Sequence, residues 1–514
     1  MKKILIIACI AISIIHQSCK KDSNRQNTGS TAIDSKNSET NLAQTKFAVL
    51  LAKAVKSDPD LRNFLKNESL KQFDNDHDIL YHMVKDVKIN GAETLHEKLI
   101  RYQVSDKELD SIETQLPLLT IFIPSLPSFS PEKWNAASEV PFIATSNVGE
   151  SNVSLYDGSG NSMVLKPNQT PAFPVLVIKQ NERVIVNRNS LQSTAKMSNS
   201  IKNGSSIAYQ NSNLSLSFAD KAFDGTNKSK QVNFVKSNAA IVNDIDPISI
   251  EAYNSGNEWH RDYIYYGLTA STPNGEFKHN YSEFITSFKF LTPNALGIIS
   301  DQDEDPKKND LYGQANTKPP LPKTMWTEGN FEIKITILIN AKNGAGSELT
   351  KVMSVSPGEL FDLQYDLIQD AHGPFGTIKI YQIKSVTPKE FHPNIELVPW
   401  DLENYGTAWK FIFYETDNAQ EITKSYENTS TYAGNFGIDL GVSKKIGLKF
   451  GGSATTSTKN SYTVKTTLNS DFLGEAILTF DQPIITGSSG GSYTTREITT
   501  GNLLSITVQP KKVF

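Results

Sequence analysis

The stretch from Phe436 to Phe450 alternates between two kinds of residue, and it constrains the fold of this chain more than any other segment. Its odd positions hold glycine, serine, aspartate and lysine, while seven of its eight even positions are apolar: Phe436, Ile438, Leu440, Val442, Ile446, Leu448 and Phe450. Period-two alternation places one kind of side chain on each face of a β-strand. Ser443-Lys444-Lys445 interrupts the apolar runs and suits a turn. Because the flanks are rich in serine, threonine and asparagine, we expect a long β-hairpin with polar legs and an apolar tip.

The N-terminus has the features of a bacterial export signal. Two lysines precede Ile4–Ile15, an apolar run of twelve residues interrupted only by Ser13, which is too short to span a bilayer but suited to a signal peptide. The following Ser18-Cys19 resembles the lipobox of bacterial lipoproteins, although His16 stands where an aliphatic residue is preferred. The resemblance implies that residues 1–19 are a signal peptide and that Cys19 carries a lipid. An ordinary secretory signal cut nearby is the alternative.

Cysteine usage and charge narrow the class of protein. The only two cysteines lie in the first twenty residues, which excludes a disulfide framework, a cysteine metal site or a catalytic cysteine in the remaining chain. The net charge is −4 and the charged residues are scattered along the sequence. A nucleic-acid partner is not expected, because it would require a basic stripe.

The hydrophobic pattern predicts a mainly β protein with a small N-terminal α-helical region, antiparallel β-sandwich domains and a long C-terminal β-hairpin. Apolar residues recur with helical spacing from Phe47 to Val55, and Phe331, Ile333, Ile335, Ile337 and Ile339 alternate as in a strand. Composition and pattern predict seven segments: a signal peptide (1–19), a flexible tether (20–44), a helical region (45–115), a small β domain (116–188), a polar linker or mobile loop (189–243), a β-sandwich-like domain (244–400) and a C-terminal β region with the hairpin (401–514).

Two clusters of residues are candidate ligand sites. Trp259, His260, Arg261 and Asp262 combine a cation with aromatic neighbours, which predicts a ligand pocket, with a core and rim cluster as the alternative. The acidic run Asp301–Asp305 places the carboxylates of Asp301, Asp303 and Asp305 at alternate positions, as calcium requires. It lacks the glycine and the final glutamate of an EF-hand, so a solvated acidic loop is the alternative, and no other cofactor is expected.

Three further patterns are compatible with chemistry but favour structure. Asp74, Asp76, His77 and Asp78 suit a metal or, as we prefer, the capping of a helix that begins there. Residues 487–491 match G-x-S-x-G, but strand-like residues follow, so a turn between strands is expected. The His-Glu-x-x-His motif of zinc proteases does not occur. No nucleophile, base and orienting residue assemble by motif, and we expect a protein that is not an enzyme.

Residues 420–480 resemble the insertion hairpin of aerolysin-like β-pore-forming proteins, with serine- and threonine-rich legs and an alternating tip. That resemblance implies a membrane-active hairpin. The chain as a whole resembles uncharacterised envelope lipoproteins of bacteria. We therefore expect a lipid-anchored cell-envelope protein, in the outer membrane on its periplasmic or surface face, that binds a glycan, a peptide or an envelope protein. A membrane-active protein using the 420–470 hairpin is the alternative.

Overall fold

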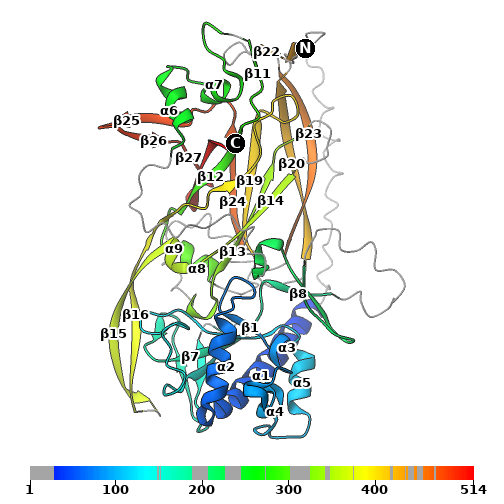
Figure 1. Cartoon of the computed structure of the whole chain (residues 1–514), viewed down its shortest axis with the longest axis vertical. Coiled ribbons are helices and arrows are strands. Elements are labelled where there is room, and N and C mark those ends of the chain that lie inside the picture. Colours follow the sequence, from blue (N-terminus) through cyan, green and yellow to red (C-terminus); the bar gives the residue numbers. More distant parts are fainter. Residues whose placement is uncertain are drawn as a thin grey trace, which may run out of the picture.

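A computed structural model shows a mainly β protein, elongated, with the helices of its N-terminal region gathered at one end (Figure 1). The structure describes residues 28–147, 150, 152–187, 206–225, 245–272, 274–300, 325–341, 348–373, 376–416, 421–433, 436–437, 445–447, 455–467 and 471–514. We call residues 28–225 the N-terminal unit and residues 245–514 the β body. The predicted fold class, mainly β with an N-terminal helical region and antiparallel sheets, is confirmed.

The N-terminal unit packs helices against one face of a six-stranded sheet. The helices are α1 (Thr28–Ser57), α2 (Pro59–Ser69), α3 (Tyr81–Val84), α4 (Leu95–Ile100) and α5 (Glu108–Gln115), with a 3-10 turn η1 (Ile89–Gly91). The sheet has the order β1-β2-β7-β3-β4-β5, with β1 (Asp78–Leu80), β2 (Leu119–Phe122), β3 (Phe142–Thr145), β4 (Val153–Tyr156), β5 (Ser162–Leu165) and β7 (Val175–Gln180). Its pairs are antiparallel except β3 with β7, which is parallel.

The predicted division between a helical region and a small β domain at 115/116 is wrong, because one core joins them. Phe47 of α1 and Leu61 of α2 belong to the same buried cluster as Ile121, Ile143 and Ile178 of the sheet. A short helical bundle could not bury its apolar stripe alone, and the sheet supplies the missing layer.

Two predicted polar segments are more ordered than expected. Helix α1 begins at Thr28, and Ala43 and Gln44 are buried, so the tether predicted for 20–44 is wrong over 28–44. Part of the 189–243 linker also folds into strands. A three-stranded sheet of order β8-β10-β9 contains β8 (Val184–Val186), β9 (Ile207–Gln210) and β10 (Ser215–Phe218), followed by η2 (Lys221–Phe223).

The β body is a sandwich of two sheets over one large core. One sheet has the order β17-β12-β28-β27, with β18 also on β12; the other has the order β14-β13-β19-β24. Their strands are β12 (Tyr281–Phe290), β17 (Glu390–Phe391), β18 (Ile395–Glu396), β27 (Glu497–Thr499), β28 (Leu504–Lys512), β13 (Phe331–Leu338), β14 (Glu348–Val355), β19 (Ala408–Glu415) and β24 (Asp471–Thr479). Because β19, β24 and β28 complete these sheets, the predicted boundary at 400/401 is wrong.

Short elements and three hairpins surround this sandwich. The short elements are α6 (Pro247–Asn254), α7 (His260–Tyr266), β11 (Asn274–Glu276), α8 (Ala295–Ile299), η5 (Met325–Thr327) and α9 (Pro357–Leu360). The hairpins are β15 (Phe361–Gly373) with β16 (Gly376–Pro388), β20 (Glu421–Ala433) with β23 (Thr455–Thr467), and β25 (Ile485–Ser489) with β26 (Ser492–Thr495). The last hairpin turns at Gly490 and Gly491, both at positive φ, so the turn predicted for 487–491 is confirmed.

Strand β13 is the centre of the body and is covered on both faces. Phe331, Ile333, Ile335 and Ile337 alternate into the core as predicted, and each is at most 1% exposed. The other face is buried as well, with Glu332 toward the N-terminal unit and Leu338 under the β20–β23 hairpin. The apolar alternation predicted only the first of these two burials.

The β15–β16 hairpin straps the two halves together along one side of the molecule (Figure 1). Near its base, Leu363 and Val386 pack on the body core. Farther along, Ile378 and Ile380 pack with Phe122 and other residues of the N-terminal sheet. In addition, β16 pairs with β6 (Gln169–Pro171) of the N-terminal unit.

Candidate functional site

The most unusual group of side chains lies between the N-terminal unit and the β body. We call it the junction cluster, and it consists of six carboxyl groups and two cations: Asp74, Asp76, Asp78, Glu182, Glu328, Glu332, Lys179 and Arg183. The loop before β1 and the strand itself supply the aspartates, while the end of β7 and the turn after it supply the cations and Glu182. In the β body, Glu328 comes from the segment that leads into β13, and Glu332 lies within β13 itself.

Arg183 is the hub of this cluster. It is fully buried, and its Nε donates to Glu332 Oε1 across the junction at 2.6 Å. Its terminal nitrogens lie 3.1 Å from Asp78 Oδ2 and 3.2 Å from Asp76 Oδ2, and one of them also donates to the Asn330 carbonyl. One guanidinium thus binds carboxylates from both halves of the molecule, which its planar set of donors permits.

Lys179 is the second cation and is 1% exposed. Its Nζ donates to Glu182 Oε2 at 3.0 Å and to the backbone carbonyl of Glu328, and it lies 4.8 Å from the centre of the Phe122 ring. Asn181 also bridges the aspartates, with its amide nitrogen 2.8 Å from Asp74 Oδ2. Both cations therefore lie among several carboxylates.

Close backbone contact closes the junction at Gly329. This residue has φ +93°, and a Cβ there would lie 2.2 Å from Asp76 Oδ2. Glycine allows both the conformation and the approach, and the next amide, that of Asn330, donates to Asp76 Oδ2 at 2.8 Å. A hydrogen bond thus crosses directly from the β body to the N-terminal unit.

Carboxyl groups outnumber cations in this buried space, and their pKa values reflect it. Burial raises the pKa of Asp78 well above its usual range, and burial with the charge of Glu182 raises the pKa of Glu328 to about 7. Burial raises the pKa of Glu332 to about 8, although Arg183 acts in the opposite direction. For Asp76, burial is outweighed by Arg183 and Lys179, so its pKa is lowered. The cluster therefore holds protons near neutral pH and titrates as a unit.

The sequence pointed to part of this cluster but assigned it another role. The prediction that the aspartates of 74–78 cap a helix is wrong, because Asp78 begins strand β1 and the carboxylates face Arg183 and Asn181. Within the described residues, no group of three or more histidine, cysteine, aspartate or glutamate side chains is arranged to hold a metal ion. Only the unusual density of acids at 74–78 was visible in the sequence, because its partners lie more than 100 positions away.

The residues predicted to line a ligand pocket lie at the start of α7, inside the β body. His260, Arg261 and Asp262 are each at most 3% exposed, and Trp259 is partly buried. Arg261 forms a two-pronged ion pair with Glu283, with nitrogen to oxygen distances of 2.9 and 3.0 Å, and its guanidinium carbon lies 5.2 Å from the centre of the Trp400 ring. These contacts are those of a buried core, as in the alternative interpretation of a core and rim cluster. That these residues bind a ligand remains a prediction.

His260 and Asp262 are uncharged or partly charged for physical reasons. His260 Nδ1 accepts from the amides of Ile484 and Ile485, and burial with the charge of Arg261 lowers its pKa to about 4. Burial raises the pKa of Asp262 to about 7, and its Oδ1 has no hydrogen-bond partner among the described residues.

The predicted long hairpin exists, and its legs are the best-described part. Strands β20 and β23 pair without a break from Glu421–Thr467 to Ala433–Thr455. They are inserted between β19 and β24, which are hydrogen-bonded neighbours, and they lie along the sheet in Figure 1. Tyr462 and Val464 of the legs bury against Leu338, Ile412 and Tyr414 of that sheet.

Only part of the apolar tip is described. Strand β21 (Phe436–Gly437) pairs with β22 (Lys445–Gly447), placing Phe436 opposite Ile446, and β22 also pairs with β11. The other predicted positions of the apolar face lie outside the described residues: Ile438, Leu440, Val442, Leu448 and Phe450. Cys19 and the acidic run with Asp301, Asp303 and Asp305 also lie outside them.

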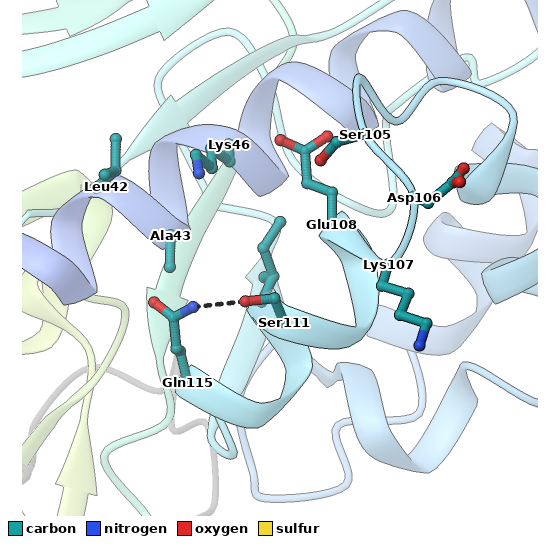
Figure 2. A pocket seen from close by; sticks show the side chains of 10 residues that line it. Leu42, Ala43, Lys46, Ser105, Asp106, Lys107, Glu108, Ser111 and Gln115 are labelled. Atoms are coloured by element: carbon teal, nitrogen blue, oxygen red, sulfur yellow. Dashed lines mark hydrogen bonds between the residues drawn. The ribbon is translucent and has the colours of Figure 1, made fainter.

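A cleft of about 370 Å³ separates α1 from α5 at the outer end of the N-terminal unit (Figure 2). Leu42, Ala43 and Lys46 of α1 form one wall, and the other wall is the loop and helix from Ser105 to Gln115, where Gln115 donates to Ser111. Its charges are balanced, because two lysines face one aspartate and one glutamate. The cleft does not select a ligand by charge.

The outer edge of β15, a strand of 13 residues, is a long open strand edge. Its sheet has the order β15-β16-β6, so β15 pairs with β16 alone, and it forms the left margin of Figure 1. Along it, Asp362, Gln364, Asp366 and Leu367 are exposed, and Leu367 is 52% exposed. Unpaired N–H and C=O groups of such an edge accept a further strand.

Fold and site together define a class of mainly β protein in which an α/β unit is joined by buried ion pairs to a sandwich with long hairpins. No family model, curated protein or solved structure matches the chain. Among the described residues, no helix is both long and apolar enough to span a membrane.

Proposed function

We propose that this chain is a lipid-anchored cell-envelope protein of the outer membrane that binds another envelope component through its β body and catalyses no reaction. Cys19 would carry the anchor. The observation that supports binding most is the open edge of β15, because the buried charged groups of the two clusters already bind one another. The ligand class that fits an open edge is an extended peptide segment of an envelope protein.

The chemistry of the edge indicates what segment it accepts. A strand added to β15 would hydrogen-bond through its backbone, which provides affinity without a particular sequence. Asp366 is already paired with Lys384 of β16 at 3.1 Å, but the exposed Asp362 carboxylate has, among the described residues, only the neutral Gln364 amide as its side-chain donor. Asp362 therefore favours a segment with a basic side chain, whereas a second copy of the same edge would bring two such carboxylates together. The partner is therefore expected to be a different chain.

Photo-crosslinking in intact cells tests the binding site. A photoreactive residue at Leu367 should give a discrete higher-mass product, and the same residue at Val164 should not. Val164 is the matched control because it is 58% exposed on β5, another edge strand. Monomer alone from probes at Asp362, Gln364 and Leu367 would contradict the proposed edge.

Labelling with a fatty acid tests the anchor separately. Wild-type protein should incorporate the label and sediment with membranes, and Cys19→Ser should do neither. Unlabelled wild-type protein together with a membrane-bound Cys19→Ser variant would exclude the lipid anchor.

A second candidate function is a membrane-active hairpin, and one observation favours it. The β20–β23 legs leave and re-enter the body between adjacent strands, so they can detach without breaking the β19–β24 pairing. Against it, Lys424 lies on the docked face, 4.8 Å from the Tyr414 ring centre, and a charge facing lipid is costly. Release of dye from vesicles by wild-type protein would favour this second function, and intact vesicles would favour binding.

A further inference from the structure

We propose that the junction cluster is a proton-operated clasp between the N-terminal unit and the β body: bound protons keep the junction closed, and their release opens it. This device goes beyond the proposed binding function and does not depend on it.

The distribution of charge across the junction is the basis of the proposal. The N-terminal side contributes four carboxyl groups and both cations, so its face carries −2 when every group is ionised. The β-body side contributes only Glu328 and Glu332, and also carries −2. Two fully ionised faces would therefore repel each other, whereas protonation removes the repulsion and leaves the hydrogen bonds of Arg183 and Lys179 in place.

Burial makes that repulsion strong. The three aspartates, Glu328 and Glu332 are each no more than 8% exposed, and the side chain of Glu182 is 7% exposed. Water therefore screens these carboxyl groups little. Asp78 Oδ1 has no hydrogen-bond partner among the residues that the structure describes, which disfavours its ionised form further. The raised pKa values of Asp78, Glu328 and Glu332 agree with this account.

Among the described residues, the titratable groups that act most on Glu328 and Glu332 belong to the cluster itself. On the N-terminal side they are Lys179 and Glu182 at the end of β7, Arg183 in the turn, and the aspartates of the loop before β1. The nearby His77 turns its ring toward Glu132 and the Ser69 carbonyl. Opening the junction would expose Glu328 and Glu332 to water and return their protons to solution at neutral pH.

The strap formed by β15 and β16 makes such an opening a local event. It keeps its own contacts to both halves, through β6 and through the apolar cluster around Ile378 and Ile380. The two halves therefore remain tethered on that side while the ionic side separates.

Hydrogen exchange of the full-length protein tests the clasp at a bond that crosses the junction. The amide of Asn330 donates to Asp76, and its protection relative to the intrinsic exchange rate should fall as pH rises from 5.5 to 7.5. The expected fall is about tenfold per pH unit for each proton released on opening. The reference is the amide of Glu283, which donates to the Val398 carbonyl within the body and should keep its protection.

The double variant E328Q/E332Q separates titration from other effects of pH. Both glutamines keep the shape of a protonated glutamate, so Asn330 should stay protected at every pH between 5.5 and 7.5. Constant protection in wild-type protein would overturn the clasp, and so would an equal loss at Asn330 and Glu283. A pH-dependent loss of protection that persists in E328Q/E332Q would also overturn the clasp. If the double variant does not fold, E328Q alone is measured, and a loss of protection with the same dependence on pH as in wild type would overturn the clasp.

Discussion

Two buried arginines serve this molecule in different ways. Arg261 lies within the β body and is matched by one carboxylate, Glu283, with backbone carbonyls and the Trp400 ring completing its surroundings. Arg183 lies between two halves of the chain and faces Asp74, Asp76, Asp78 and Glu332. The first is a matched pair and the second has a surplus of negative charge.

The difference determines which contact can respond to pH. A matched buried pair keeps both charges over a wide pH range, because losing either leaves the other uncompensated. A surplus of carboxyl groups around few cations must instead take up protons, and the number depends on pH. The Arg261–Glu283 pair is therefore expected to be insensitive to pH between 5.5 and 8, and the junction sensitive.

The largest effect is expected from Arg183→Met. Removing the hub leaves several buried carboxyl groups unpaired, which should cost about 3–5 kcal/mol in the free energy of unfolding at pH 7.5. The loss should be smaller at pH 5.5, where those carboxyl groups are protonated. Chemical denaturation at both pH values measures it.

Arg62→Met is the control for that experiment. Arg62 is also buried, but its guanidinium donates to the carbonyls of Val55 and Ala136. The loss of stability in Arg62→Met should be the same at both pH values. An equal pH dependence in Arg62→Met and Arg183→Met would contradict the role given to the surplus negative charge around Arg183.

Glu283→Gln tests the matched pair. The substitution leaves Arg261 buried without a counterion, and we expect a loss of about 3 kcal/mol that is the same at pH 5.5 and pH 8. Thermal unfolding at the two pH values is the measurement. A loss that disappears at either pH would mean that the pair titrates and that the contrast with Arg183 is wrong.

Glu328→Gln should increase the stability of the protein at neutral pH, whereas Arg183→Met and Glu283→Gln decrease it. Because the folded-state pKa of Glu328 is raised to about 7, its ionisation removes stability as pH rises from about 4.5 to 7. Glutamine cannot ionise, so the variant should match wild type near pH 4.5 and be more stable by about 3 kcal/mol at pH 7. Denaturant titrations along this pH range measure the difference.

Glu113→Gln provides the contrast within the N-terminal unit. Burial is outweighed there by hydrogen bonds from His96 and Lys85, which lower the pKa of Glu113 to about 2. Its stabilisation is present above the ordinary pKa of glutamate and is lost as pH falls toward 2, so this variant should be less stable than wild type at pH 7. If Glu113→Gln and Glu328→Gln changed the stability at pH 7 in the same direction, the opposite pKa shifts assigned to the two glutamates would be contradicted.

Sequence reasoning predicted elements whose signal is local. The alternation of Phe331 to Ile339 and the legs of the hairpin are both patterns within a short window, and each is found in the structure. The outer face of β13 was missed, because a glutamate and a leucine on one face carry no periodic signal of burial. Their covers, Arg183 and the hairpin legs, come from distant segments.

The candidate sites show the same limit. Arg183 stands in a short polar turn after β7, and nothing near it in the sequence indicates that it lies beside acids 105 and 149 positions away. The edge of β15 follows from the order of strands in a sheet, which residue patterns do not specify. Long-range pairing, rather than residue type, determines both sites.

The smallest effect is expected where the hairpin meets the sheet, at a third kind of contact, a hydrogen bond between two neutral side chains. Tyr462 is 8% exposed and donates its hydroxyl hydrogen to Asn340. Tyr462→Phe keeps the ring and removes that bond, so we expect a loss of about 1 kcal/mol in the free energy of unfolding that does not change between pH 5.5 and 8.

The control is Tyr493→Phe on the β25–β26 hairpin, where the ring is partly buried and the effect should be within about 0.5 kcal/mol. Protease cleavage within the legs should also rise in Tyr462→Phe, because the docked hairpin opens more often. A loss that grows at one end of the pH range would mean that the legs are coupled to a titrating group, and the division into one pH-sensitive and two insensitive contacts would then be wrong.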